Sequence, residues 1–317
     1  MRAVVAHGPG DFRLSEVEEP ACPAGGLLVQ VEATGLCAAD RMLWTGRHPW
    51  GELSWPFIPG HELLGRVIEG GLPVGTRVTA EVKLPCGECP ACVRGQDQLC
   101  PHGRHLGSGI PGGFAERVAL PAQARVHVVP AGLPTEQAVL AEPMACALHA
   151  VRRAGVREGD RVAVAGLGGL GALAVQAARA EGAAHVTAVV RSDEKLALAR
   201  DVGYDDATTD PADAAYDVVV DVSGAGEAVE VLLRAVRPGG RVGVYGVYDR
   251  PLSLDLNALA EFGELQVSGG HLAPGCFPDA IALLDGVHGV VTGTHTLAGL
   301  TAAFDPKPHR LKEIVVP

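Results

Sequence analysis

Short apolar runs separated by turn residues dominate the first 143 residues of the chain. Such runs lie at 27–33, 63–69, 77–81 and 115–120. Clusters such as Pro23-Ala24-Gly25-Gly26 interrupt them. Apolar runs bounded by Gly and Pro are typical of strands joined by tight turns. The pattern predicts an irregular, mostly β domain over residues 1–143.

From residue 144 the pattern changes to apolar strands that alternate with helices. The expected strands lie at 161–165, 185–190, 217–222, 241–247 and 265–268, and the expected helices at 170–182, 193–202 and 227–236. Near-continuous apolar strands that alternate with helices predict a parallel sheet covered on both faces. We therefore expect an α/β domain at 144–267. Residues 268–317 are too few for a third domain, so we expect them to return to the first.

Composition and charge narrow the class of protein. The chain has 317 residues, of which 47% are hydrophobic and 20% charged, and its net charge is −11. This composition is globular, and the acidic balance disfavours nucleic acid or an anionic membrane as partner. The N-terminus lacks the apolar segment of a signal peptide, and no apolar run is long enough to span a membrane. We expect a cytoplasmic protein that acts on a small molecule.

Four of the eight cysteines lie within a short segment, at positions 86, 89, 92 and 100. Four thiolates can close a tetrahedron around zinc and leave no position for water, which makes such a site structural. Pro, Gly and charged residues between the cysteines argue against core packing. Cys86, Cys89, Cys92 and Cys100 therefore predict a structural zinc site, with disulfides as the alternative.

A second set of possible metal ligands is spread over three short motifs. Cys37 and Asp40 lie in Gly35-Leu36-Cys37-Ala38-Ala39-Asp40, His61 and Glu62 follow Gly60, and Glu142 precedes Pro143. Thiolate, imidazole and carboxylate ligands together suit a zinc ion that keeps one position open for water or substrate. Each motif taken alone also fits a buried cysteine or a surface His-Glu pair.

A glycine-rich segment follows the first expected strand of the α/β domain and begins its first helix. Its residues Gly166, Leu167, Gly168, Gly169, Leu170 and Gly171 fit the pattern Gly-x-Gly-x-x-Gly. In this context the backbone N–H groups of the helix start bind a dinucleotide pyrophosphate, as in a Rossmann fold. A glycine-rich turn without ligand is the alternative.

The end of the second expected strand indicates which dinucleotide binds. An enzyme that uses NAD(H) carries an acidic residue there, whereas this chain has Val190 followed by Arg191 and Ser192. A guanidinium and a hydroxyl bind a 2′-phosphate, and Lys195 can add positive charge. We predict NADP(H) in preference to NAD(H); a solvated Arg191 in a loop is the alternative.

The order and spacing of these motifs resemble the zinc-containing medium-chain dehydrogenase/reductase family, which includes alcohol and polyol dehydrogenases. The resemblance implies a GroES-like catalytic domain interrupted by the Rossmann domain, and two zinc ions per chain. It implies Cys37 and His61 as ligands of the catalytic zinc and Glu62 as a third or exchangeable ligand. Glu142 occupies the position of the remaining ligand, and Asp40 would orient His61. It also suggests a homodimer or homotetramer.

The chain departs from the family at the proton relay. Where the family usually has Ser or Thr and then His, this chain has Ala39 and Met42, which cannot carry a proton. Glu142 followed by Pro143 resembles the polyol, sugar and amino-alcohol members, and we interpret Cys146 as a packing residue. We expect hydride transfer between NADP(H) and a hydroxyl or carbonyl group. The alternatives are a reductase of conjugated alkenes or iminium ions and a non-catalytic nucleotide or redox sensor.

Overall fold

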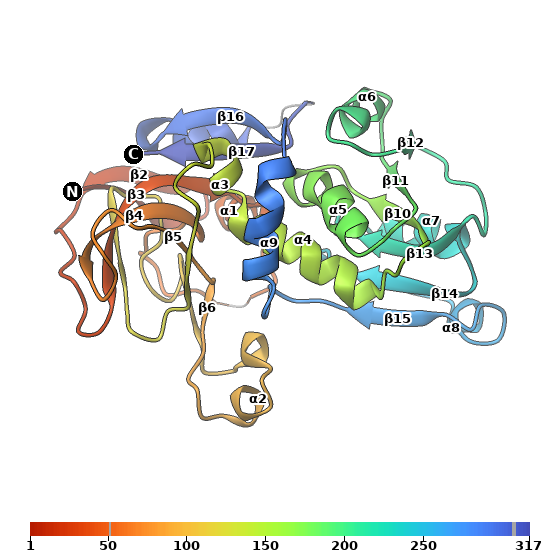
Figure 1. Ribbon diagram of the computed structural model, residues 1–317, viewed down its shortest axis with the longest axis horizontal. Helices are drawn as coiled ribbons and strands as arrows, with labels where there is room; N and C mark the ends of the chain where they lie inside the picture. Colours follow the sequence, from red (N-terminus) through yellow and green to blue (C-terminus); the bar gives the residue numbers. More distant parts are fainter. Residues whose placement is uncertain (51, 306–308) are drawn as a thin grey trace.

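The computed structural model describes residues 1–50, 52–305 and 309–317, and two large sheets dominate it (Figure 1). The first sheet, called here the mixed sheet, comprises β3 (Leu27–Leu36), β4 (Glu62–Gly70), β5 (Arg77–Ala80), β8 (Arg117–Leu120), β9 (Val126–Val128), β16 (Val291–Thr296) and β17 (Lys312–Val316). Its order is β16-β17-β3-β4-β5-β9, and β8 also pairs with β3. Only β16 and β17 run parallel to each other, so the described strands of this sheet are mostly antiparallel.

The second sheet, called here the parallel sheet, is built from segments in the middle of the chain. Its described strands are β10 (Arg161–Ala165), β11 (His185–Val189), β12 (Asp206–Thr208), β13 (Tyr216–Asp221), β14 (Val236–Val244) and β15 (Gln266–Gly269). They run parallel in the order β12-β11-β10-β13-β14-β15. The helices α5 (Gly169–Ala180), α6 (Glu194–Asp201) and α7 (Gly226–Ala235) connect them. This is the doubly wound arrangement that the alternating pattern predicts.

A long helix, α4 (Ala141–Ala154), lies between the two sheets in Figure 1. It packs against α5, α9 (Phe277–Leu283), β4 and β14. Met144, Ala147 and Leu148 are fully buried, and they belong to one hydrophobic cluster with residues of both sheets. Pro143 is compatible with helix because it lies in the first turn, and Gly155 ends the helix with φ of 74°. A single core therefore joins the halves of the molecule.

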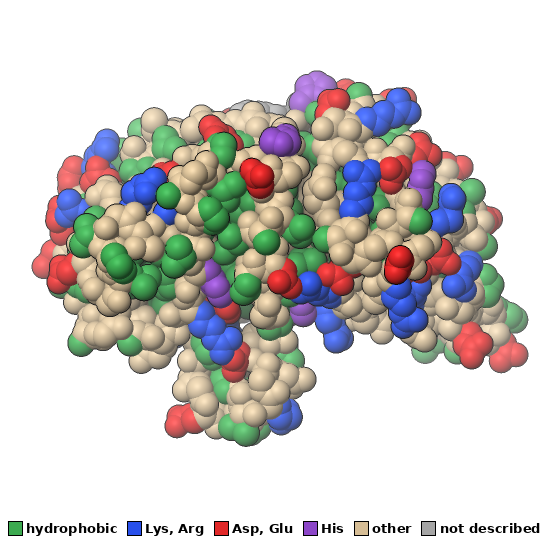
Figure 2. Space-filling view, in the orientation of Figure 1, with side chains coloured by type: hydrophobic (Ala, Val, Ile, Leu, Met, Phe, Trp, Pro, Cys, Tyr) green, Lys and Arg blue, Asp and Glu red, His purple; other side chains and the backbone are tan. Residues whose placement is uncertain are grey.

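The cysteine-rich segment forms a lobe that protrudes from the body, as Figures 1 and 2 show. It contains β6 (Lys83–Leu84), α2 (Pro90–Val93), the short 3-10 helix Asp97–Leu99 and β7 (Arg104–His105). The remaining described elements are β1 (Arg2–Gly8), β2 (Asp11–Glu16), α1 (Ala38–Thr45), α3 (Thr135–Ala138), α8 (Leu256–Leu259) and the 3-10 helices Leu284–Gly286 and Leu297–Phe304. In Figure 2 acidic and basic side chains are interspersed on the visible face, which shows no broad basic surface.

Most predicted elements agree with the structure within a few residues, with one clear correction. A strand is predicted at 241–247, but β14 already begins at Val236 and includes Pro238-Gly239-Gly240, which the sequence predicts as the end of the preceding helix. The pairing of β14 with β13 shifts in register after Tyr216. The domain boundaries after residues 143 and 267 remain predictions. In the structure, α4 continues across the first boundary and β15 across the second. Among the described residues, none of the helices has the length and apolar character needed to cross a bilayer.

Candidate active site

The four lobe cysteines come together around a common centre. The Sγ–Sγ distances are 3.5 Å for Cys89–Cys92, 3.7 Å for Cys89–Cys100, 3.5 Å for Cys86–Cys100 and 4.0 Å for Cys86–Cys92. A tetrahedron with zinc–sulfur bonds of about 2.3 Å has edges of about 3.8 Å, so the cysteines fit a closed zinc site. A disulfide needs about 2.05 Å, and all eight cysteines are free thiols. The disulfide alternative is therefore not what the structure shows.

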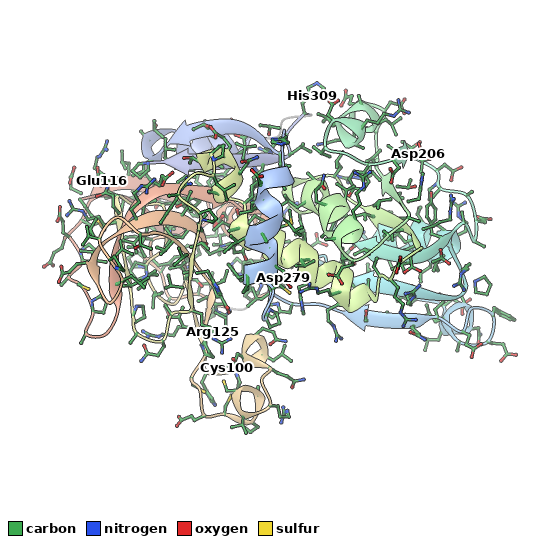
Figure 3. All side chains as sticks on the ribbon, viewed as in Figure 1. Cys100, Glu116, Arg125, Asp206, Asp279 and His309 are labelled. Atoms are coloured by element: carbon green, nitrogen blue, oxygen red, sulfur yellow. The ribbon has the colours of Figure 1, made fainter. Side chains whose placement is uncertain are left out.

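Polar contacts fix the lobe to the body of the protein. Arg125, labelled in Figure 3 where the lobe meets the body, forms an ion pair with Asp97 of the lobe and lies 3.8 Å from a Glu81 carboxylate oxygen. Cys100, also labelled, lies within the lobe, and its Sγ accepts a hydrogen bond from the Cys86 backbone N–H at 3.4 Å. Backbone N–H groups directed at the sulfurs stabilise thiolates, as a metal ligand requires.

The second set of predicted ligands lies where two strands of the mixed sheet end and begin. Cys37 follows β3 and is the N-cap of α1, and Glu62 begins β4 directly after His61. One ligand atom from each of Cys37, His61 and Glu62 lies within 4.8 Å of the other two. Gly60 adopts φ of +95°, a conformation that favours glycine, and thereby turns the chain into β4. The structure thus brings together residues that are far apart in the sequence.

The carboxylate of Glu62 lies over the backbone of β3 at Gly35, its paired residue in the sheet. A Cβ atom at Gly35 would lie 1.9 Å from Glu62 Oε2, so only glycine leaves room for this carboxylate. Lys312 of β17 forms a buried ion pair with Glu62 Oε1 and donates a hydrogen bond to the Leu36 carbonyl at 3.3 Å. Glu62 Oε2 is buried without a hydrogen-bond partner in the described structure, which leaves it free to bind a cation.

Asp40 is buried, binds the backbone of Cys37 and lies near His61. Its Oδ2 accepts a hydrogen bond from the Cys37 backbone N–H at 2.8 Å, and its Oδ1 lies 4.0 Å from His61 Nδ1. Burial opposes the charged imidazolium, but Cys37, Asp40 and Glu142 outweigh it and raise the pKa of His61 well above its ordinary value. The site is therefore strongly negative, as expected of residues that hold a divalent cation.

Glu142 lies near this set but is turned toward its own helix. It is buried in the first turn of α4, and its Oε1 accepts a hydrogen bond from Cys146 Sγ at 3.2 Å. Burial, followed by the negative charge of Glu62, raises the pKa of Glu142. Burial and the adjacent carboxylate also raise the pKa of Cys146 well above its usual value, so the thiol stays protonated and can donate. Cys146 thus contacts a candidate ligand, beyond the packing role predicted for it.

The two positions of the missing relay lie on α1, directly after Cys37. Ala39 is half-buried, and Met42 lines an open cleft together with Arg41 of the same helix. The opposite wall of this cleft comes from the ends of β13 and β14 and includes Ser223 and Tyr248. The carboxyl ends of parallel strands are where ligands bind in sheets of this type. The cleft therefore lies beside α1, whose N-cap is Cys37, and it adjoins the glycine-rich segment, because a Cβ atom at Gly166 would lie 2.8 Å from Ser223 Cβ.

The glycine-rich segment has the conformation expected of a dinucleotide-binding turn. It follows β10, and Gly168 is the extended N-cap of α5, so Gly169 and Leu170 lie in the first helical turn with free N–H groups. Gly166 has φ of +101°, and a Cβ atom at Gly171 would lie 1.9 Å from the Gly166 carbonyl oxygen. Leu167 connects the two glycines of the turn.

The residues predicted to select NADP(H) differ in their environments. Val190 is buried, whereas Arg191 is exposed and has no ion-pair partner within residues 1–50, 52–305 and 309–317. Ser192 follows it and is half-buried. Lys195 donates hydrogen bonds to the carbonyls of Leu167, at 3.2 Å, and Arg310, at 2.8 Å. Arg191 is therefore available to bind a ligand, while Lys195 stabilises the glycine-rich turn through its hydrogen bond to Leu167.

Lys312 is the main site residue that the sequence analysis missed. It is 5% exposed and lies 250 positions from Glu62 in the chain. The one local signal is a charged pair, Lys312-Glu313, at the start of the apolar segment Ile314-Val315-Val316. Charged residues in such a segment indicate a buried polar contact, but they cannot identify the distant partner.

Comparison with known proteins agrees with this geometry. Residues 23–131 match the family described as "Alcohol dehydrogenase GroES-like domain", and residues 169–286 match "Zinc-binding dehydrogenase". The erythritol/L-threitol dehydrogenase of Mycolicibacterium smegmatis is 37% identical over an alignment 314 residues long, which covers 90% of this chain and 87% of the relative. The L-threonine 3-dehydrogenase of Pyrococcus abyssi is 36% identical over 275 residues, 81% of this chain and 78% of the relative.

A solved structure from Sinorhizobium meliloti, described as a zinc-binding dehydrogenase bound to NADP, superimposes with a TM-score of 0.92 at 30% identity, covering 100% of this chain and 99% of that one. Both the GroES-like and the Rossmann parts of the expected fold are thereby confirmed. The two relatives are named as dehydrogenases of erythritol or L-threitol and of L-threonine, all of which are small compounds that carry hydroxyl groups. The chain therefore belongs to the zinc-containing medium-chain dehydrogenase/reductase family and is an oxidoreductase that acts on hydroxyl groups.

Proposed function

We propose that this protein transfers a hydride between NADP(H) and a hydroxyl or carbonyl group of a polyol, sugar or amino alcohol. The observation that carries the proposal is the convergence of Cys37, His61 and Glu62 at the start of α1, the helix that forms one wall of a cleft whose Ser223 adjoins Gly166. In the oxidative direction the carbinol C–H bond would break, and NADP⁺, when bound, would accept the hydride. The hydroxyl proton leaves to solvent, and the alcohol, which loses two electrons, becomes a carbonyl compound.

Two zinc ions per chain fit the residues present. Cys86, Cys89, Cys92 and Cys100 would hold a structural ion. Cys37, His61 and Glu62, whose ligand atoms lie within 4.8 Å of one another, would hold a catalytic one together with Glu142. The catalytic ion supplies Lewis acidity to the substrate oxygen when bound. Asp40 orients His61, and Lys312 holds the Glu62 carboxylate at the β3 backbone. Elemental analysis of carefully prepared protein should give two zinc ions per chain.

We assign the proton-transfer role to Glu142, because Ala39 and Met42 offer no group that can carry a proton. Burial raises the pKa of Glu142, which makes its carboxylate a stronger proton acceptor than an exposed one. The Cys146 thiol donates to Oε1 of Glu142 and thereby fixes the orientation of the carboxyl group.

We attribute cofactor selection to Arg191 and Ser192, with Lys195 supporting the turn. Arg191 is exposed and has no ion-pair partner among the described residues, and position 190 holds Val in place of an acidic residue; both observations support NADP(H). A charge-assisted contact to phosphate contributes roughly 1.5–3 kcal/mol, so Arg191→Ala should erase much of the preference measured as kcat/KM. A wild-type enzyme that prefers NAD(H) would contradict the assignment.

The test of the activity itself is a substrate panel with NADP⁺ and NADPH. Alditols, amino alcohols and the matching ketones should be turned over, and His61→Ala should abolish turnover while the protein stays folded. Reduction of a conjugated enal without any alcohol oxidation would favour the alkene-reductase alternative. Binding of NADP(H) without turnover of any class would favour the sensor.

We also propose that the protein forms homo-oligomers. β15 is the outer strand of the parallel sheet (Figure 1), and Val267 on it is 50% exposed. Leu256 and Phe262, which precede it in the chain, are 71% and 73% exposed. Exposed apolar side chains beside an unpaired strand edge favour association with a second copy. Light scattering should show an oligomer for the wild type and a smaller species for Phe262→Asp.

A further inference from the structure

A buried carboxylate at the end of β13 binds the loop after β13 and the loop after β14. Asp221 is 1% exposed. Its Oδ1 accepts hydrogen bonds from the N–H and the hydroxyl of Ser223, at 3.0 and 2.5 Å. Its Oδ2 accepts from the Gly224 N–H at 3.3 Å and from the Tyr248 hydroxyl. A buried charge is costly unless hydrogen bonds satisfy it, so these four donors hold both loops to Asp221.

The backbone of Asp221 binds the loop after β14 a second time. Its carbonyl oxygen accepts hydrogen bonds from the N–H groups of Tyr245 and Gly246, at 2.9 and 3.1 Å. A Cβ atom at Gly246 would lie 2.6 Å from Asp221 Oδ2 and also 2.6 Å from Gly224 Cα, so only glycine permits this close approach of the two loops. The shape of both loops therefore depends on one residue, at the carboxyl ends of neighbouring parallel strands, where ligands bind in such sheets.

The two loops form one wall of the open cleft whose other wall is α1. The cleft has a volume of about 520 Å³, and both Tyr248 and Ser223 line it. Met42, which lines it from α1, follows the N-cap Cys37 by five positions, about 7.5 Å along a helix. A Cβ atom at Gly166 of the glycine-rich turn would lie 2.8 Å from Ser223 Cβ. The cleft thus lies between the pyrophosphate-binding turn and the helix that begins at a metal-binding residue, as the nicotinamide half of a dinucleotide requires.

We infer that Asp221 and Tyr248 are positioning residues for the cofactor: the carboxylate holds the tyrosine ring and the two loops in the arrangement that binds the nicotinamide half of NADP(H). The inference rests on the proposed function, because it takes a nicotinamide nucleotide as the ligand of the cleft. Burial, followed by the hydrogen bond to Asp221, raises the pKa of Tyr248, so its hydroxyl stays protonated and donates. A loop that is already ordered loses less conformational entropy when its ligand binds, so this contact strengthens cofactor binding.

Binding of the whole cofactor and of its adenosine half provides the test. The probes are NADPH and NADH, and the fragments 2′,5′-ADP and AMP, which lack the nicotinamide; their Kd values are measured by calorimetry on the zinc-loaded protein. Tyr248→Phe keeps the ring and removes the hydroxyl, and it should raise the Kd of the preferred cofactor at least about threefold. Asp221→Asn, which disturbs all four hydrogen bonds, should raise it at least about tenfold, or about 1.4 kcal/mol. The Kd of the matching fragment should change less than about twofold in both variants.

Two further variants separate the positioning role from other causes. If the Tyr248 hydroxyl acts through Asp221, adding Tyr248→Phe to Asp221→Asn should raise the Kd by less than about a further twofold. Asp217→Asn is the matched control, since Asp217 lies on the same strand and accepts hydrogen bonds from the Arg161 N–H at 2.9 Å and from Arg237 Nε at 2.8 Å. It should lower the melting temperature without changing the ratio of cofactor to fragment affinity.

The outcomes distinguish this inference from the proposed function. Wild-type cofactor affinity in Tyr248→Phe, or an equal loss of cofactor and fragment affinity, would overturn the inference and leave the proposed function standing if alcohols are oxidised. Selective loss of cofactor affinity in a protein that turns over none of the alcohols would support the positioning role and contradict the proposed function. A wild-type protein that binds neither NADPH nor NADH would overturn both.

Discussion

The buried ion pair between Lys312 and Glu62 allows a quantitative test of how the site is held together. Lys312 is 5% exposed and Glu62 is 1% exposed, so water screens neither charge. Lys312→Met keeps the length of the side chain but leaves the Glu62 carboxylate buried without its cation. Removing one partner of a buried pair typically costs about 3–5 kcal/mol. The lost hydrogen bond to the Leu36 carbonyl, 3.3 Å long, belongs to the same loss.

Glu62→Gln removes the orphaned charge and should restore much of that stability. In the double variant neither charge is buried, so the coupling energy of the pair should be at least about 2 kcal/mol. The free energy of unfolding of all four proteins is obtained from urea titrations, with zinc content measured in each preparation. Zinc must stay constant across the cycle, because metal binding adds to stability.

Lys195→Met serves as the matched control, since Lys195 donates only to backbone carbonyls of Leu167 and Arg310. Its coupling to Glu62→Gln should lie within about 0.5 kcal/mol of zero, as expected for sites that share no partner. A Lys312–Glu62 coupling below about 1 kcal/mol, at constant zinc content, would refute the claim that this pair positions the carboxylate.

Three further predictions concern the lobe, the proton route and acid stability. Cys89→Ser should remove one zinc equivalent and lower the melting temperature, because structural zinc contributes directly to folding; unchanged zinc content in elemental analysis would contradict the lobe assignment. Glu142→Gln should lower kcat by roughly 10²–10⁴-fold with little change in zinc content, and adding Ala39→Ser should recover part of the rate; full activity of the single variant would rule out Glu142. Burial and, after it, the positive charge of Arg153 lower the pKa of His149 from 6.5 to about 4. Between these two pH values His149 is therefore protonated in the unfolded chain but neutral in the folded protein. Stability should fall as pH drops through this range, and His149→Phe should show a shallower fall in thermal melts.

Local patterns were sufficient to predict the parallel sheet and the nucleotide turn. β10 occupies the predicted residues 161–165, and α5 begins within one residue of the predicted helix at 170. These elements are specified by nearby residues: β-branched runs, and glycines that only a tight turn requires. The ligands of the lobe were equally accessible, because the four cysteines lie within a short segment.

Non-local features could not be predicted in the same way. α4 is buried on nearly all sides, so it has no polar face from which its helical period could be recognised in the sequence. β17 joins the mixed sheet beside β3, which the sequence cannot show because 276 positions separate Leu36 from Lys312. The prediction for Cys146 fell short for a related reason: its hydrogen bond to Glu142 depends on helical spacing within α4.

The position of β17 determines when the site can form during protein synthesis. β3 and β4 emerge early from the ribosome, yet β3 acquires its neighbour β17, and Glu62 its cation, only after residues 312–316 have been made. β8 can already pair with Leu27–Gln30, so the nascent mixed sheet exposes only the 34–36 end of β3 while the parallel sheet, residues 161–269, is translated. Such long-range closure makes assembly of this sheet slow compared with the local βα units. The strands of the parallel sheet can consequently pair before Glu62 acquires its cation.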